Sequence, residues 1–218
     1  MVNILLSRSF IDNPYLYLYF KKYIKKGMKV LVIPWSFYPG YDYDNYRPGG
    51  DRYNKLIDQF IPYEIEERDI TWLDYYNDNH EIAVKKIKQA DLIYLTGGLP
   101  DKLFERLEEF DIISNLENFK GIMLGISAGA VVQFQTYHLS PDRDYKKFNI
   151  YPGLKIINDF GVEVHYGDRK WRQNKALNKI NKILPRSYYT IPNAGALIKD
   201  GDRIILINGS KKHYFKGE

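Results

Sequence analysis

Short apolar runs alternate along the chain with longer stretches in which apolar residues recur every three or four positions. The short runs are rich in leucine and β-branched residues, and they predict buried strands at residues 2–6, 29–33, 70–73, 92–95 and 122–126. The longer stretches predict amphipathic helices at residues 13–26, within 50–63, and at 79–90, 100–110 and 128–137. Strands and helices that alternate in this way are typical of a parallel sheet covered on both faces. We therefore predict an α/β fold, a three-layer α/β/α sandwich with a mostly parallel, flavodoxin-like central sheet.

The C-terminal third departs from this alternation. Residues 162–166 predict a further strand, and residues 168–183 predict a helix. Three short strands are expected after it, at residues 188–191, 196–198 and 203–207, the last two joined by a turn at residues 199–201. The sequence contains no internal repeat, low-complexity tract or linker-like segment, so we expect one α/β domain that spans residues 1–218.

Composition excludes several classes of protein. The chain has 218 residues and no cysteine, which excludes a disulfide framework, a thiolate metal site and a cysteine nucleophile. The first residues, MVNILLSRSF, lack the basic segment and long apolar core of a signal peptide. No apolar run approaches the roughly 18 residues that a membrane span needs. We expect a soluble cytoplasmic protein that requires no metal and no organic cofactor.

The net charge of +5 raises the question of a polyanionic partner. Basic clusters occur at residues 21–26 (KKYIKK), 85–88 (KKIK) and 211–212 (KK), but each lies near acidic residues or on a predicted solvated helix face. No aromatic-basic repeat or nucleic-acid-binding motif accompanies them. We therefore expect neither a nucleic-acid nor a membrane partner, and the sequence leaves open whether the chain forms a homodimer.

One long loop follows the carboxyl end of a predicted strand. Residues 36–50 (SFYPGYDYDNYRPGG) are rich in glycine, proline and tyrosine. Ligands of open α/β sheets bind at this edge. The loop is either a lid or pocket wall, or a surface segment packed against itself.

The strongest chemical signal is Gly125-Ile126-Ser127-Ala128-Gly129, which matches the pattern G-x-S-x-G. An apolar strand precedes it and a helix with small residues in its first turn follows, which is the context of a nucleophile elbow. Such a turn strains the serine backbone so that the hydroxyl projects from the sheet, and free N–H groups at the helix start can stabilise an oxyanion. Ser127 is the candidate nucleophile, with a buried serine in a tight turn as the alternative.

A second strand-to-helix junction carries a pair of glycines, in the segment TGGLP at residues 96–100. Glycines at the carboxyl end of a strand let backbone N–H groups face a ligand. We predict that the N–H groups of Gly98 and Ala128 form an oxyanion hole, with a flexible turn as the alternative. A Walker-type phosphate loop is disfavoured, because no Gly-Lys-Ser/Thr follows.

Ser127 needs a base, and the chain has four histidines. His80 falls at the start of a predicted surface helix, His138 near the end of the elbow's own predicted helix, and His213 among lysines near the C-terminus. His165 ends an apolar strand-like run, VEVHY, where its side chain would lie at the edge of the sheet. We therefore favour His165 as the base.

The group that orients the imidazole is less sharply defined by the sequence. Asp142 and Asp144 lie in a polar loop between Ser127 and His165, and either could accept the second imidazole N–H. Asn193, in the segment IPNAG, could do the same as a neutral amide. For all three residues the alternative is a solvated loop.

At these motifs the chain resembles the family of aspartyl dipeptidase (peptidase E) and cyanophycinase. The resemblance covers most of the chain and rests on TGGLPDKL at 96–103, GISAGA at 125–130, YPGL at 151–154 and VHYGDRKWRQNKAL at 164–177. Proteins of this family are serine hydrolases on the class I glutamine amidotransferase-like fold, so the resemblance implies that fold here.

The resemblance also implies a role for individual residues. The acid of the dipeptidase follows its serine at the spacing that separates Ser127 from Asp142, and arginines follow its histidine. The roles implied are the nucleophile Ser127, the base His165, the acid Asp142, the oxyanion donors Gly98 and Ala128, and the substrate-binding arginines Arg169 and Arg172, which could hold a carboxylate.

The chain departs from the family at two motif positions: Tyr166 replaces the usual Phe after the histidine, and Leu99 replaces an Asn. Amidotransferase relatives carry cysteine at the elbow, so Ser127 argues against glutamine hydrolysis. We expect a serine peptidase-like hydrolase that cleaves a small peptide, an Asp-X dipeptide or an isopeptide-like amide, through an acyl-enzyme on Ser127. An esterase or acyltransferase on the same elbow, or a catalytically silent ligand-binding protein, is the alternative.

Overall fold

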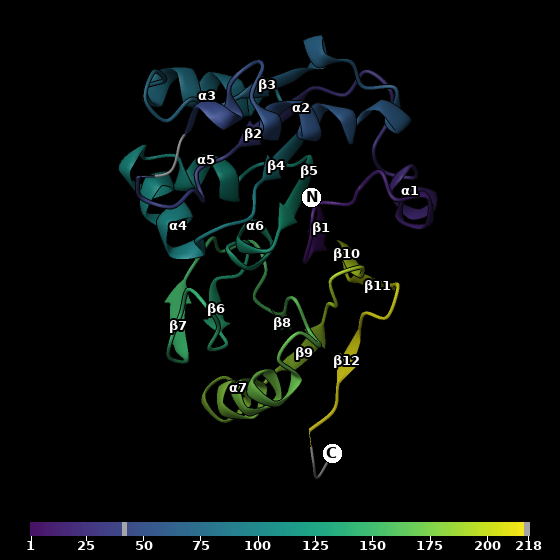
Figure 1. Cartoon of the computed structure of the whole chain (residues 1–218), viewed down its shortest axis with the longest axis vertical. Helices are drawn as coiled ribbons and strands as arrows, with labels where there is room; N and C mark the ends of the chain where they lie inside the picture. The colour runs from purple at the N-terminus through teal and green to yellow at the C-terminus, as the bar shows by residue number, and fades with distance from the viewer. Residues whose placement is uncertain (41–42, 216–218) are drawn as a thin grey trace.

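The central sheet of the computed structural model, which describes residues 1–40 and 43–215, has seven strands. These are β1 (Val2–Leu6), β2 (Val30–Ile33), β3 (Ile70–Trp72), β4 (Leu92–Leu95), β5 (Ile122–Ile126), β10 (Ala196–Asp200) and β11 (Arg203–Ile207). Their order is β11-β10-β1-β5-β4-β2-β3, parallel from β1 to β3, with β10 and β11 antiparallel at one edge (Figure 1). The predicted α/β class with a mostly parallel central sheet is confirmed.

Helices cover both faces of this sheet, because its strands are apolar on both sides. The helices are α1 (Pro14–Phe20), α2 (Asp51–Asp58), α3 (His80–Gln89), α4 (Pro100–Glu109), α5 (Ile113–Glu117) and α6 (Ala128–Val131). One face of β2, presented by Val30 and Val32, shares a core with α1 and α2. The other face, presented by Leu31 and Ile33, shares a core with α3, α4 and α5. Each fully buried Leu or Ile in these layers contributes roughly 1.5–3 kcal/mol.

Two smaller sheets extend the molecule beyond the predicted layers. The first has the order β12-β9-β8 and comprises β8 (Phe160–Glu163), β9 (Ser187–Thr190) and β12 (Lys211–His213); the second pairs β6 (Thr136–Leu139) with β7 (Asn149–Pro152). The long helix α7 (Lys170–Ile183) packs on β9 through Leu177 and Ile180 against Tyr188. In Figure 1 α7, β9 and β12 lie at the opposite end of the molecule from α2 and α3.

The predicted helix at residues 128–137 is wrong beyond its first turn. α6 ends at Val131, and residues 136–139 form β6 instead. The carbonyls that a continuing helix would need accept hydrogen bonds from elsewhere: Val132 from the N–H of Leu154 at 2.7 Å, and Gln133 from that of Ile157 at 3.1 Å. Tertiary pairing therefore overrides the local helical pattern.

The predicted helix at residues 13–26 is also shorter than expected. Asn13 caps it, because its side chain accepts from the N–H groups of Tyr15 and Leu16, but α1 ends at Phe20. The chain then turns toward Gly27, whose φ of 72° is left-handed.

Among the described helices, none combines the length and the apolar character that a membrane crossing requires.

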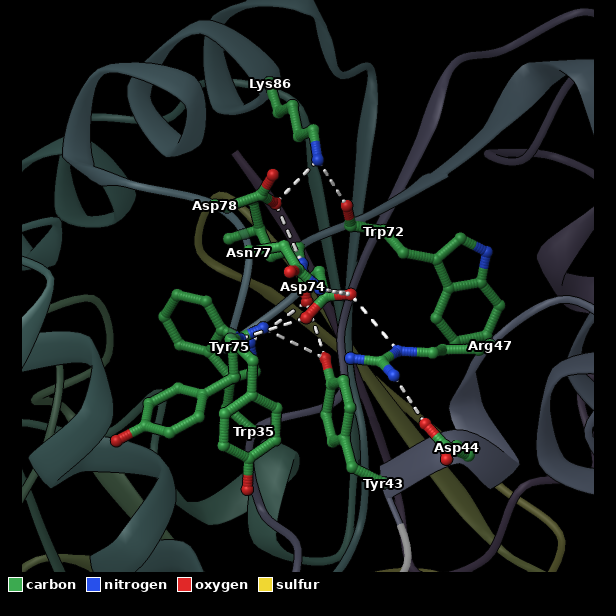
Figure 2. Close-up of polar contacts among 12 residues, drawn as sticks. Trp35, Tyr43, Asp44, Arg47, Trp72, Asp74, Tyr75, Asn77, Asp78 and Lys86 are labelled. Atoms are coloured by element: carbon green, nitrogen blue, oxygen red, sulfur yellow. Dashed lines mark hydrogen bonds and ion pairs between the residues drawn. The ribbon is translucent and has the colours of Figure 1, made fainter.

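The loop after β2 is anchored to the loop between β3 and α3 by a polar network around Asp74 (Figure 2). Oδ2 of Asp74 accepts from Nδ2 of Asn77 at 2.8 Å and lies 3.3 Å from Nε of Arg47. The hydroxyl of Tyr43 donates to the carbonyl of Leu73 at 2.9 Å. Burial alone would raise the pKa of Asp74, but the hydrogen bonds and Arg47 outweigh it and lower that pKa.

The loop at residues 36–50 was expected to be either a lid or pocket wall, or a segment packed against itself; its residues 41–42 lie outside the described residues. The loop packs against itself, since Phe37, Tyr43 and Tyr46 form a buried cluster. It also lines a cavity beside Ser127 with Phe37, Tyr38 and Tyr46, so it is both packed against itself and a wall of that cavity.

Candidate active site

Ser127 lies in the turn between β5 and α6, with φ 50° and ψ −103°, a backbone conformation that residues other than glycine rarely adopt. The turn closes only with small neighbours. A Cβ on Gly125 would lie 2.1 Å from the carbonyl oxygen of Gly129, and a Cβ on Gly129 would lie 2.2 Å from that of Leu95. The N–H of Ser127 donates to the carbonyl of Leu6 at 2.8 Å. This geometry is that of the nucleophile elbow predicted from the sequence.

The imidazole of His165 lies beside the Ser127 hydroxyl, with Nε2 2.8 Å from Oγ. His165 follows β8 by two residues and has a φ of 53°. Its N–H donates to Oγ of Ser7 at 2.8 Å, and the Ser7 hydroxyl donates to the carbonyl of Ile191 at 2.7 Å. Since Ser7 directly follows β1, it fastens the histidine loop of the small sheet to the central sheet. The structure thus brings together a serine from one sheet and a histidine from the other.

Asn193 is the hydrogen-bond partner of the other ring nitrogen. Its Oδ1 lies 2.7 Å from Nδ1 of His165, and its Nδ2 donates to Oδ1 of Asp168 at 2.8 Å. A carboxylate oxygen only accepts, so the amide nitrogen of Asn193 must face Asp168 and the amide oxygen must face His165. An amide oxygen also only accepts, so Nδ1 carries the ring proton and Nε2 presents its lone pair to Ser127. The network selects the tautomer that a general base needs.

The predicted contact between Asp142 and His165 is not formed among the described residues. Oδ1 of Asp142 accepts instead from the N–H groups of Asp144 at 2.8 Å and Tyr145 at 2.7 Å. The physical reason is local, since an aspartate in a turn is readily taken up by the N–H groups two and three residues further on. Of the three candidates for orienting the base, the geometry favours Asn193 and gives Asp142 a role in shaping its loop.

Gly98 and Ala128 both line the cavity beside Ser127. Gly98 has a φ of 148°, and a Cβ there would lie 2.1 Å from the carbonyl oxygen of Ser36, so glycine is required. Among the described residues, neither the N–H of Gly98 nor that of Ala128 donates a hydrogen bond. Both predicted oxyanion donors are therefore available at the carboxyl edge of the sheet, close to the nucleophile.

Two cavities meet at Ser127, and Arg8, Tyr38 and Gly98 border both. The α2-side cavity, of about 820 Å³, is also lined by Arg52 and Lys55. The histidine-side cavity, of about 470 Å³, is lined by His165 and Ala128 and by the loop at residues 138–145.

Tyr38 forms a bridge between the loops that border the two cavities. Its hydroxyl donates to Oδ2 of Asp144 at 2.8 Å. Burial, followed by this hydrogen bond and the negative charge of Asp144, raises the pKa of Tyr38, so the phenol stays protonated and keeps donating near neutral pH.

The two predicted substrate-binding arginines are separated. Arg169 is the N-cap residue of α7 and lines the histidine-side cavity with Ser127 and His165. Arg172, one turn further along, lines a different hollow of about 700 Å³ between α7 and the loop at residues 141–148. We call this hollow the α7 groove.

Sequence reasoning missed a buried polar pair on the wall of the histidine-side cavity. His138 is 4% exposed and Glu163 is 6% exposed, and Nε2 of His138 lies 2.8 Å from Oε2 of Glu163. The hydroxyl of Ser140 donates to the same carboxylate oxygen at 2.8 Å. His138 was expected on a helix, and its position on β6 was signalled only weakly, by the β-branched and aromatic run TYHL. Ser7 was also missed; its signal was a serine directly after a buried strand.

Acidic and imidazole side chains do not gather into a metal site in the part of the chain that the structure describes. No group of three or more His, Cys, Asp or Glu residues there has a suitable arrangement.

A serine on a strand-to-helix elbow, held against a histidine at the carboxyl edge of a parallel sheet, is the arrangement of a serine hydrolase. Comparison with known families makes this specific. The model of Peptidase family S51 matches residues 12–207, so the chain belongs to that family and is a serine-type peptidase. The resemblance noted from the motifs is confirmed.

Solved structures agree with the fold. A protein from Listeria monocytogenes EGD-e that is assigned as a peptidase E has 21% sequence identity and a TM-score of 0.68, with 98% of each chain covered. A peptidase from an acI-B1 Actinobacterium has 22% identity and a TM-score of 0.64, covering 97% of this chain and 93% of that one. A comparison with curated proteins finds no match.

Proposed function

We propose that the protein hydrolyses a small peptide that begins with an acidic residue, through an acyl-enzyme on Ser127. The observation that carries the proposal is the 2.8 Å contact between Oγ of Ser127 and Nε2 of His165 at the elbow. Oγ attacks the scissile carbonyl carbon while Nε2 takes the hydroxyl proton. The N–H groups of Gly98 and Ala128 stabilise the oxyanion, and each such donor is typically worth about 10²–10³ in rate.

The intermediate then collapses in two stages. The C–N bond breaks as the imidazolium of His165 returns the proton to the leaving amine, which leaves an ester on Ser127. A water molecule then gives a proton to Nε2 and attacks the ester carbonyl; when the C–Oγ bond of the second tetrahedral intermediate breaks, the imidazolium returns that proton to Oγ, which restores the serine hydroxyl and releases the carboxylic acid product. Throughout, Asn193 accepts from the Nδ1–H, and its own amide is held by Asp168.

The position of the base supports one orientation of the substrate. Because His165 protonates the leaving amine, the leaving group has to occupy the histidine-side cavity, which His165 lines. The acyl part then occupies the α2-side cavity, which His165 does not line. Arg8, Arg52 and Lys55 border that cavity together with Asp12 and Asp58, and the excess of positive charge favours a carboxylate there, as the side chain of an N-terminal aspartate would supply. An Asp-X dipeptide fits this arrangement.

Replacing Ser127 with alanine tests the proposal. Wild-type protein should hydrolyse members of an Asp-X dipeptide panel, and Ser127→Ala should reduce kcat by about 10³-fold or more, as expected for a lost nucleophile. A fluorophosphonate probe should label the wild type and spare Ser127→Ala. Ser114→Ala, in α5, is the matched control and should retain the wild-type rate. An unchanged rate in Ser127→Ala, or turnover of an ester panel with no peptide cleavage, would overturn the proposal.

A further inference from the structure

The α7 groove is strongly cationic. Five of its ten lining residues are basic: Lys146, Lys147, Arg172, Lys175 and Lys179. In the described part of the chain none of the five forms an ion pair, although nine pairs between a lysine or arginine and a carboxylate are formed elsewhere. Five like charges around a hollow of about 700 Å³ repel one another. An anionic ligand would relieve that repulsion.

The sequence of α7 aligns these charges along one face. Arg172, Lys175 and Lys179 are spaced three and four residues apart, which places successive side chains on the same side of a helix. Two ammonium groups lie over aromatic rings, Lys175 at 5.6 Å from the centroid of Trp171 and Lys179 at 4.5 Å from that of Phe148. Such contacts hold long side chains in place, so the row of charges is partly ordered before any ligand arrives.

A large aromatic surface lies beside the charges. Trp171 is 74% exposed, the highest fraction among the exposed large hydrophobic side chains of the described chain. An exposed tryptophan next to a cationic groove offers an apolar contact for the backbone and side chains of a bound peptide.

The groove adjoins the catalytic cleft. Pro141 and Asp142 border both the α7 groove and the histidine-side cavity. The histidine-side cavity is the one that we assign to the leaving group, since His165 has to protonate the leaving amine. A leaving group longer than one residue therefore extends past Asp142 into the row of lysines.

From this adjacency and the cationic lining we infer that the α7 groove binds an acidic C-terminal extension of the substrate, so that the preferred substrates are acidic oligopeptides cleaved after their first residue. The inference rests on the proposed peptidase function. Carboxylates of the extension pair with Lys175, Lys179 and Arg172, while the scissile bond lies at Ser127. A peptide is favoured over a nucleic acid, because only a peptide uses the groove and the peptidase cleft together.

Kinetics with two peptides test the inference. The probes are Asp-Ala and a hexapeptide in which the same dipeptide is followed by aspartates. Wild-type KM should be about tenfold lower for the hexapeptide at low salt, and the difference should shrink at high salt because the paired charges are exposed. Lys175→Glu/Lys179→Glu should raise the hexapeptide KM about tenfold or more and leave the Asp-Ala KM within about twofold, whereas Lys175→Arg/Lys179→Arg should behave as wild type.

The matched control reverses two exposed lysines elsewhere. Lys85→Glu/Lys88→Glu on α3 changes the net charge by the same amount, far from the groove along the chain, and should leave both KM values unchanged. Equal effects from the two double variants would mean that only net charge matters, and would overturn the inference. The inference would also be overturned if the wild-type enzyme had a lower KM for Asp-Ala than for the acidic hexapeptide, or a lower KM for a hexapeptide with lysines in place of the aspartates.

A binding measurement separates failure of the groove from failure of the peptidase. The Kd of a labelled hexapeptide for Ser127→Ala, measured by fluorescence anisotropy, does not depend on turnover. Absence of hydrolysis together with groove-dependent binding would refute the proposed function alone, and hydrolysis of Asp-Ala without such binding would refute the groove alone. If a duplex oligonucleotide binds more tightly than the hexapeptide, and this binding is lost in Lys175→Glu/Lys179→Glu, the ligand of the groove is a nucleic acid and the inference of a peptide is overturned.

Discussion

Replacing Asn193 with alanine perturbs the orienting network at its centre. The change removes the oxygen that lies 2.7 Å from Nδ1 of His165 and releases Asp168 from the amide. During acylation the imidazole gains a proton, so the lost hydrogen bond comes from a charged donor in the transition state. Hydrogen bonds to charged groups contribute about 1.5–3 kcal/mol, which corresponds to a roughly 10- to 160-fold loss of kcat.

The assay is the initial rate on the best dipeptide of the panel, with kcat and KM determined separately. Asn193 touches the base and not the substrate cavities, so we expect the loss in kcat and a KM within about twofold of wild type. Asn193 is only partly buried, so its removal should change the free energy of unfolding by less than about 1 kcal/mol in a urea titration. Asn118→Ala, at the C-cap of α5, serves as the control and should match the wild-type kcat.

A second variant decides between the candidates for the orienting group. Asp142→Asn keeps an oxygen that can accept from the N–H groups of Asp144 and Tyr145, so the loop should persist. We expect kcat to fall less in Asp142→Asn than in Asn193→Ala. If Asp142→Asn loses more than Asn193→Ala, with both variants folded, Asp142 orients the imidazole and the reasoning from the hydrogen-bond network is refuted.

Three further substitutions test the elbow, the junction of the two sheets and the anchored loop. Gly98→Ala places a Cβ 2.1 Å from the carbonyl oxygen of Ser36, so we expect a loss of about 1–3 kcal/mol in unfolding free energy and at least a 100-fold loss of activity. Ser7→Ala removes the acceptor of the partly buried N–H of His165, and we expect about 1–3 kcal/mol less stability in urea together with a lower kcat. Folding lowers the pKa of Asp74 below its ordinary value of 3.8. The ionised carboxylate therefore stabilises the folded protein fully above pH 3.8, and this stabilisation is lost as the pH falls through the pKa of Asp74 in the folded state. Asp74→Asn should therefore be less stable near neutral pH and lose less stability on acidification, as measured by thermal melts between about pH 6 and pH 2.

Each of these variants has a control at an exposed site. Gly201→Ala has a φ of 57° with no atom within 4 Å, so it tests backbone strain without a clash and should leave activity intact. Ser114→Ala and Asp202→Asn remove exposed polar groups of the same types and should change stability by less than about 0.5 kcal/mol. Loss of activity in Gly201→Ala, or full activity in Gly98→Ala, would contradict the requirement for glycine beside Ser127. If Asp74→Asn and wild type lose the same amount of thermal stability between about pH 6 and pH 2, the assigned pKa shift of Asp74 is contradicted.

The central sheet was predictable because a strand that is buried on both faces consists of a continuous run of apolar residues. The predicted bounds of β1, β4, β5 and β11 are those observed. The short strands β6, β7 and β12 were missed, because edge strands of three or four residues carry mixed polar and apolar residues and are stabilised by their pairing partners. The same cause turned the predicted helix at residues 128–137 into one turn of helix and a strand.

The nucleophile and the base could be singled out from local signals, whereas Asn193 could be named only as one of three candidates for the orienting group. Ser127 could be recognised from the glycines on either side of it, because the close packing that requires them is a local property of the turn. Asn193 reaches His165, 28 positions earlier, because β8 and β9 are parallel neighbours whose carboxyl ends meet. Strand pairing of this kind is a tertiary event with no local pattern, so Asp142, which is nearer to Ser127 in sequence, was the more visible candidate.

The attachment of the histidine loop at Ser7 has a consequence for how the enzyme fails. The serine is supplied by the large sheet and the imidazole by the small one, and the hydrogen bonds of Ser7 at the seam hold their separation at 2.8 Å. A slight loosening of that seam would silence turnover while nearly all secondary structure persists. On gentle heating, catalysis should therefore fade before the far-ultraviolet circular dichroism changes, which makes enzymatic rate the earliest gauge of how firmly the two halves interlock.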